Sequence, residues 1–223
     1  RLEPDNYAYN IPAALGLTGL LNTVALEQTF SEIVRRHEVL RTRFTINNGQ
    51  PIQVVEPEIT LALPVIDLQS LTGNEPEIGV NQLALKEAQQ PFDLAVLPLI
   101  RFKLLKLSED YHVLLMTMHH IVSDAWSTEI LMRELTTLYQ AFSQGESSPL
   151  PEIPIQYGDY AIWQRQWLSG DVLKQQLDYW KAQLAGAPTV LELRTDRPRP
   201  QIQTYNGATQ RFYINQALTG PLK

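Results

Sequence analysis

The 223-residue sequence contains no cysteine, which excludes disulfides, thiolate metal sites and a cysteine nucleophile. Cationic side chains are also few: 18 Lys and Arg stand against 24 Asp and Glu, so the net charge is −6 and no basic footprint for nucleic acid or anionic lipid exists. No apolar run approaches the ~20 residues that a membrane span needs. We therefore predict a cytoplasmic chain that binds neither nucleic acid nor a membrane.

Motifs for phosphate and metal binding are missing as well. The segment GLTG at 16–19 is too short to act as a glycine-rich phosphate loop. His120 and Asp124 have a spacing that a metal site can use, but the neighbouring acidic or cysteine ligands of a full site are absent. The sequence therefore predicts no metal site and no cofactor bound by this chain. Because the chain starts at Arg1 and not at methionine, we expect it to be part of a longer protein.

The hydrophobic pattern alternates between strand and helix periods and predicts an α+β fold. Asn48-Gly49 is a strong signal for a two-residue hairpin turn, and Ser108-Glu109-Asp110 marks a second hairpin. The predicted strand segments are 7–17, 41–55 and 98–120. The predicted helices are 20–37, a helix in 77–93 that is closed by Pro91, 125–142, 157–170 and 171–186.

The composition changes after Gly145, and prolines then accumulate. We predict a lobe at 1–186, a proline-rich linker at 187–205, and the first element of a second lobe at 206–223, where the segment 208–220 starts a strand. The helix predicted after the loop carries a stripe of aromatic side chains three or four residues apart, for which we favour core packing over substrate contact. These side chains are Tyr157, Tyr160, Trp163 and Trp167.

Adjacent histidines end an apolar strand in LLMTMHHIVSDAWSTEIL at 114–131. Successive side chains of a strand point to opposite faces, so only one of His119 and His120 can enter a single cleft. Histidine is well suited to exchanging protons near neutral pH, and loops often carry catalytic residues. Asp124 stands where the loop becomes a helix, a position that favours an N-cap. From the residues alone, a strand end followed by a capped helix is the simpler interpretation.

Motifs along nearly the whole chain resemble those of condensation domains of nonribosomal peptide synthetases, in the chloramphenicol-acetyltransferase-like superfamily. HHIVSDAWS at 119–127 resembles the HHxxxDG signature, and RRHEVLRTRF at 35–44 resembles the second core motif. IQYGDYAIWQRQWL at 155–168 resembles the fourth, while QLDYWKAQLAGAP and LELRTDRPRP resemble the segment that leads into the second lobe. The resemblance implies the N-terminal lobe of such a domain, with a mixed or antiparallel sheet covered by helices, as half of a V-shaped pseudo-dimer.

The resemblance also implies a function. Two carrier domains each present a thioester on a phosphopantetheine arm, and a peptide bond forms between the aminoacyl or peptidyl donor and the aminoacyl acceptor. The expected partners are donor and acceptor carrier domains and an adjacent adenylation domain. His120 is then the catalytic residue that acts on the acceptor amine, and His119 is structural. The alternatives are an acyltransferase that uses coenzyme A thioesters and a non-catalytic module that docks carrier proteins. The isolated chain is expected to fold but not to catalyse.

The resemblance implies that Asp124 is structural and pairs with an arginine. Arg36, Arg41 and Arg43 are the candidate partners, and we favour Arg41 or Arg43, which share one face of a short strand. Ala125 stands where family members usually have glycine, the residue that tolerates unusual backbone angles. His37 and His112 are interpreted as ordinary, partly exposed histidines. Candidate residues of the substrate channel are Met118, Trp126 and Ser127.

Overall fold

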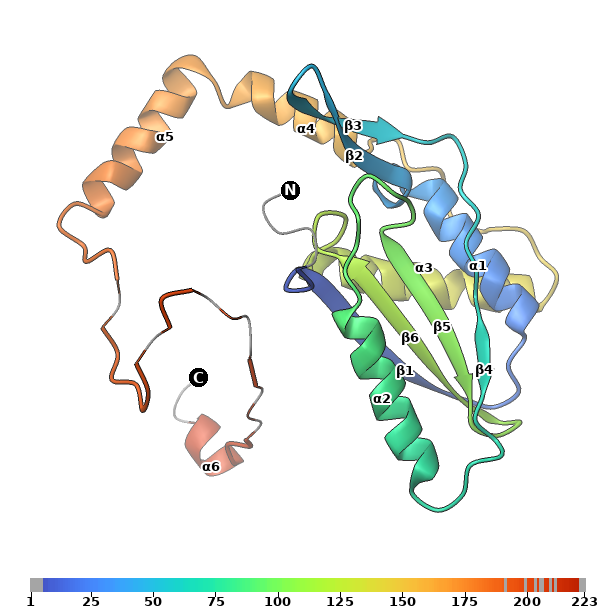
Figure 1. Ribbon diagram of the computed structural model, residues 1–223. Coiled ribbons are helices and arrows are strands. Elements are labelled where there is room, and N and C mark those ends of the chain that lie inside the picture. The colour runs from blue at the N-terminus through green and yellow to red at the C-terminus, as the bar shows by residue number, and fades with distance from the viewer. Residues whose placement is uncertain are drawn as a thin grey trace. The chain divides into compact units, whose positions relative to one another are not determined.

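The structure is a computed structural model, and it describes residues 6–190, 192–198, 200–202, 204, 207–208, 210 and 212–220 (Figure 1). Its contacts divide the chain into two compact units, of which the first ends at Leu177 and the second begins at Asp178. The predicted borders near 186 and 205 stay predictions.

The first unit contains a four-stranded sheet in the order β1-β6-β5-β4. β1 and β5 are antiparallel to β6, whereas β4 is parallel to β5, so the predicted mixed sheet is confirmed. β4 was not predicted, because three residues are too few to show an alternating pattern. The strands are β1 (Asn10–Thr18), β4 (Val65–Asp67), β5 (Ile100–Lys106) and β6 (Tyr111–His119).

Helices cover both faces of this sheet: α1 (Thr23–Arg36) and α3 (Ala125–Ser143) lie on one face, and α2 (Glu75–Gln89) lies on the other (Figure 1). The sequence of β6 explains why both faces are covered, because its side chains alternate between the two faces of the sheet and are apolar on both. Even-numbered residues of β6 join the core under α1 and α3, and odd-numbered residues join the core under α2. The even set is Leu114, Met116 and Met118, and the odd set is Val113 and Leu115.

The larger of these cores is closed by an aromatic pair. The ring of Phe30 in α1 stacks on the ring of Phe102 in β5, with centroids 3.8 Å apart and planes inclined by 17°. Both side chains are buried. Burial of such a side chain contributes about 1.5–3 kcal/mol, so this pair fixes α1 firmly on the sheet.

The predicted hairpin between β2 (Thr42–Asn47) and β3 (Gln50–Val55) is confirmed. Asn48 and Gly49 have φ angles of 49° and 79°, as a two-residue primed turn requires. A short 3₁₀ helix, η1 (Glu38–Arg41), connects α1 to this hairpin and was not predicted.

The helices α4 (Tyr157–Trp167) and α5 (Gly170–Gln183) lie where the sequence predicts them. The aromatic stripe of α4 is about half exposed, so the prediction of core packing is wrong. Its side chains stack along the helix on one another: the rings of Trp163 and Trp167 are 5.5 Å apart and inclined by 6°. A spacing of three or four residues establishes a common helix face, but not that another element covers it.

The second unit contains the end of α5 and the short helix α6 (Gln216–Thr219). The strand predicted within 208–220 is wrong for the residues described there, which are 208, 210 and 212–220, because none of them is in a strand. The side chain of Asn215 accepts a hydrogen bond from the Leu218 N–H at 3.1 Å, and asparagine is a favoured N-cap, so the segment begins a helix. Within the described part of the chain, no helix is long and apolar enough to cross a membrane.

Candidate active site

Backbone hydrogen bonds hold both histidines at the end of β6. The His119 N–H donates to the Leu99 carbonyl oxygen at 3.0 Å, and the His120 N–H donates to the Tyr9 carbonyl oxygen at 2.8 Å. The Val122 N–H donates back to the His119 carbonyl oxygen at 3.0 Å. The chain therefore leaves the sheet in a tight, defined turn immediately after the strand.

The two imidazoles have different surroundings. His119 is partly buried, with its ring centroid 6.0 Å from those of Tyr9 and Phe92, and its Nδ1 accepts a hydrogen bond from the Ile121 N–H at 3.0 Å. Burial, and to a lesser degree the charge of His120, lowers the pKa of His119, so its ring is neutral at neutral pH. His120 is exposed. That His120 faces a substrate tunnel stays a prediction.

Asp124 caps the N-terminus of α3, as predicted. Its Oδ1 accepts hydrogen bonds from the Ser127 hydroxyl at 2.6 Å and from the Ser127 N–H at 2.8 Å. These bonds lower the pKa of the Asp124 carboxyl, and nearby His120 contributes in the same direction. The exposed carboxylate is therefore ionised at neutral pH, beside the loop that carries His120.

The predicted ion pair between Asp124 and Arg41 or Arg43 is wrong; neither contact occurs in the structure, which describes all three residues. Arg41 donates to the Glu56 carbonyl oxygen at 2.6 Å and to the Glu38 carboxylate at 3.4 Å. Arg43 donates to the Glu56 carboxylate at 2.7 Å. An exposed carboxylate at a helix N-terminus is stabilised by water and by the amide groups of the helix, so it needs no cation.

Arg36, the third candidate, is buried in a cluster that sequence reasoning missed. Its Nε lies 3.3 Å from the Glu134 carboxylate, which also accepts a hydrogen bond from His37 Nε2 at 2.9 Å. Burial raises the pKa of Glu134, but the hydrogen bonds from His37 and Arg36 outweigh it, and the net shift is downward. Glu134 lies in the helical stripe of buried Leu131 and Leu138, and a carboxylate in such a stripe signals a buried cationic partner.

A cavity of about 100 Å³ adjoins this cluster, between η1, the end of β6 and the start of α3. Met118 and Ser127 both line it, whereas Trp126 is 75% exposed and does not. Two of the three predicted channel residues therefore share one cavity, and their contact with substrate stays a prediction. The remaining lining residues are His37, Val39, Leu40, Val122, Ser123, Ile130 and Leu131.

Ala125 fits its position without backbone strain. It is the first residue of α3, directly after the cap. Among the non-glycine residues that the structure describes, Asn48 alone has a positive φ. Glycine is therefore not required at Ala125 by backbone angles.

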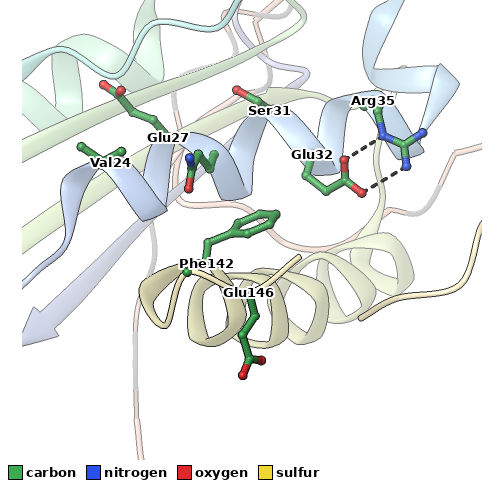
Figure 2. A pocket seen from close by; sticks show the side chains of 9 residues that line it. Val24, Glu27, Ser31, Glu32, Arg35, Phe142 and Glu146 are labelled. Atoms are coloured by element: carbon green, nitrogen blue, oxygen red, sulfur yellow. Dashed lines mark hydrogen bonds and ion pairs between the residues drawn. The ribbon is translucent and has the colours of Figure 1, made fainter. Parts of the chain in front are cut away.

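A larger, open groove of about 640 Å³ lies between α1 and the end of α3, and none of the predicted site residues lines it. Figure 2 shows Phe142 between the two helices, and the ion pair of Arg35 with Glu32, at 2.7 Å, along one side. Its other lining residues are Val24, Glu27, Gln28, Ser31, Gly145 and Glu146.

Comparison with known families assigns the class of this protein. The condensation-domain family model matches residues 1–223, and the chain belongs to that family. Two of its relatives are components of the linear gramicidin synthase of Brevibacillus parabrevis; the chain is 46% identical to one over 223 residues and 50% identical to the other over 222 residues. These matches cover all of the chain but only 3% and 4% of the length of those relatives, respectively. The chain is thus similar to one small part of each relative.

Solved structures share the fold. The X-domain from teicoplanin biosynthesis superposes with a TM-score of 0.77 at 29% identity, over 87% of this chain and 42% of that chain. SgcC5 from Streptomyces globisporus superposes with a TM-score of 0.71 at 30% identity, over 88% of this chain and 44% of the SgcC5 chain. The starter condensation domain of rhizomide synthetase RzmA superposes with a TM-score of 0.75 at 20% identity, over 84% of this chain and 45% of that chain. At this identity the likeness supports the fold alone. The predicted chloramphenicol-acetyltransferase-like lobe is confirmed, and it corresponds to less than half of each of these chains.

Proposed function

We propose that this condensation domain joins a donor aminoacyl or peptidyl thioester to the amine of an aminoacyl acceptor in nonribosomal peptide synthesis. The observation that carries the proposal is the state of His120. Its imidazole is exposed, while its backbone is fixed by the Tyr9 carbonyl oxygen and by the turn at the end of β6. A catalytic base needs such a combination, because it must reach substrate from a position that does not drift.

The reaction requires that the acceptor nitrogen attack the donor carbonyl carbon. The C–N bond forms, the C–S bond breaks, and the proton that leaves the amine is taken up finally by the departing thiolate. In our proposal His120 binds the acceptor amine and orients it or accepts its proton as charge develops. The ionised Asp124 nearby offsets positive charge that arises on the imidazole. His119, whose Nδ1 is engaged by Ile121, holds the loop.

We further propose that the donor and the acceptor arrive on phosphopantetheine arms of two carrier domains, and that an adenylation domain lies next to the condensation domain in the longer protein. The relatives support this, because they include a subunit of linear gramicidin synthase and a phosphinothricin tripeptide synthetase. The arm is then supplied by the partner, and this chain binds no cofactor of its own.

The test is to replace His120 by alanine and by glutamine in the full-length protein, and to follow dipeptide formation from loaded carrier domains by mass spectrometry. We expect turnover to fall by about 10²–10⁴-fold, as for loss of a general acid–base group. The melting temperature should stay unchanged, because the side chain is exposed. Undiminished turnover in both variants would contradict the role proposed for His120. Activity with coenzyme A thioesters and none with loaded carriers would indicate an acyltransferase of the same fold.

A second candidate function is docking without catalysis. The structural likeness to the teicoplanin X-domain favours it, because a solved complex joins that X-domain to OxyB and superposes on this chain with a TM-score of 0.74 at 30% identity. A condensation-type fold can therefore serve as a binding surface for another protein. This function would be supported if the wild-type protein binds carrier domains but forms no dipeptide from them.

A further inference from the structure

Asn10 and Arg101 donate hydrogen bonds to the last carbonyl groups of α2. The Nδ2 of Asn10 donates to the carbonyl oxygens of Ala88 and Gln90 at 2.7 and 2.8 Å. The Nη2 of Arg101 donates to the carbonyl oxygens of Gln90 and Glu87 at 2.8 and 3.2 Å. The final carbonyls of a helix lack donors within the helix, and a cation is favourable at that end. These contacts therefore fix the end of α2 against β1 and β5.

The guanidinium of Arg101 is itself held in one orientation. Its Nε contacts the buried Glu87 carboxylate at 2.6 Å, and Lys103 contacts the other carboxylate oxygen at 2.8 Å. Burial raises the pKa of Glu87, but the hydrogen bonds from Lys103 and Arg101 outweigh it and the net shift is downward. The cluster therefore remains charged at neutral pH, and Arg101 cannot turn away without leaving a buried carboxylate half-paired.

The fixed guanidinium supports an aromatic ring that reaches the histidine loop. The Arg101 Cζ lies 3.7 Å from the centroid of the Phe92 ring. The ring of Phe92 meets the ring of His119 edge-on, at 6.0 Å and 84°. Phe92 is buried, so it cannot move without disturbing its neighbours. A continuous line of contacts therefore runs from Glu87 through Arg101 and Phe92 to His119.

The orientation of the His119 ring matters because of its hydrogen bond. Its Nδ1 accepts from the Ile121 N–H at 3.0 Å, which is the geometry of a neutral imidazole with its proton on Nε2. A ring that rotates about its side-chain bonds loses this bond and releases the backbone next to His120. The tautomer of His119 and the course of the loop are thus coupled.

We propose that Phe92 and Arg101 are positioning residues, which hold the His119 ring so that its Nδ1 anchors Ile121 and thereby fix the direction of His120. Both residues lie outside the segments 35–44, 119–127 and 155–168, which resemble core motifs of the family. The effect on turnover rests on the proposed function of His120. The anchoring of the loop does not depend on that function and is measured separately.

The first test follows hydrogen exchange by mass spectrometry in the full-length protein. In Phe92→Leu and in Arg101→Gln, we expect amides of the peptide 119–124 to exchange about fivefold faster, as for loss of a single hydrogen bond. The matched control is Lys106→Gln. Lys106 lies at the other end of β5 from Arg101, and its Nζ forms an exposed ion pair with the Glu109 carboxylate at 2.6 Å. This variant should leave the exchange of the peptide 119–124 unchanged.

Phe92→Leu keeps all the ion pairs of Arg101, so it distinguishes loop anchoring from general stability. Faster exchange confined to 119–124 in this variant supports the proposal. Unchanged exchange there, or equally faster exchange in β5 and β6, overturns it. Arg101→Lys keeps the charge beside Glu87 but loses the planar group over Phe92. Compared with Arg101→Gln, we expect Arg101→Lys to restore the melting temperature of the wild type but not the slow amide exchange of the peptide 119–124.

The second test measures turnover with loaded carrier domains in the same variants. We expect kcat to fall by about tenfold to a hundredfold with KM nearly unchanged, because a misplaced catalytic group slows the reaction rather than binding. A change in KM alone would overturn a positioning role. If His120→Ala is fully active, the role proposed for His120 fails, and the exchange experiment still decides whether Phe92 and Arg101 anchor the loop.

Discussion

At the scale of single residues, Asp124 acts on the helix that follows it. Its carboxylate accepts both the amide and the hydroxyl of Ser127, and this accounts for the lowered pKa of Asp124. The resemblance to a family motif singles out Asp124. The sequence does not show whether the partner of its carboxylate is a distant arginine or the hydroxyl of Ser127, three residues away. The second arrangement is local, and the aspartate at an N-cap position was the sequence signal that predicted it.

Replacing Asp124 by alanine should lower the melting temperature by a few degrees, because the N-terminus of α3 loses its cap. Asp124→Asn should lower it less, since asparagine caps helices nearly as well.

The pKa of Asp124 in the folded protein lies below its ordinary value. The carboxylate therefore contributes its full stabilisation of the fold at pH values above that ordinary pKa. This stabilisation disappears as the pH falls through the folded pKa. Thermal unfolding at neutral and acidic pH measures the effect; equal melting of both variants and the wild type would contradict the cap.

At the scale of elements, the cluster around Glu134 connects α1 to α3. Glu134→Gln leaves Arg36 buried without a counter-charge, and we expect a loss of about 3 kcal/mol in the free energy of unfolding. The control is Glu129→Gln, on the exposed side of the same helix. Urea titration at pH 7 measures both.

The lowered pKa of Glu134 fixes the sign of the pH dependence. The carboxylate contributes its full stabilisation above the unfolded pKa of glutamate, about 4.3, and loses it as the pH falls through the lower folded value. The difference between wild type and Glu134→Gln should therefore shrink in acid. A difference that stays constant down to pH 2 would show that Glu134 does not act as a buried anion.

The elements themselves were largely predictable, for identifiable reasons. Asn48-Gly49 specifies its hairpin through backbone angles that few other residues adopt, and the alternation along β6 specifies two buried faces. Contacts between distant segments were not predictable. Arg36 and Glu134 are 98 positions apart, and no periodicity reports on such a pair. The stripe on α4 has the spacing of a packed face, yet spacing does not reveal what, if anything, covers it.

At the scale of the whole molecule, the chain matches 42–45% of the solved chains that share its fold. We expect the isolated 223-residue chain to form its sheet and helices and to produce no dipeptide from loaded carrier domains. Holding amine and thioester in a near-attack geometry contributes up to about 7–11 kcal/mol, and a single lobe offers only part of the surface that does so. Mass spectrometry of the product, with the full-length protein as the positive control, tests this. Turnover equal to that of the full-length protein would contradict it.

The surroundings of His119 come from segments that are widely separated in the chain: Tyr9 on one side, Phe92 on the other, and Arg101 behind Phe92. This has a consequence for recombination between synthetases. A crossover placed between residues 10 and 119 would combine a histidine loop from one parent with supporting rings from another. Junctions outside 9–124 transfer the loop together with Tyr9, Phe92 and Arg101, so hybrid enzymes joined there keep these contacts.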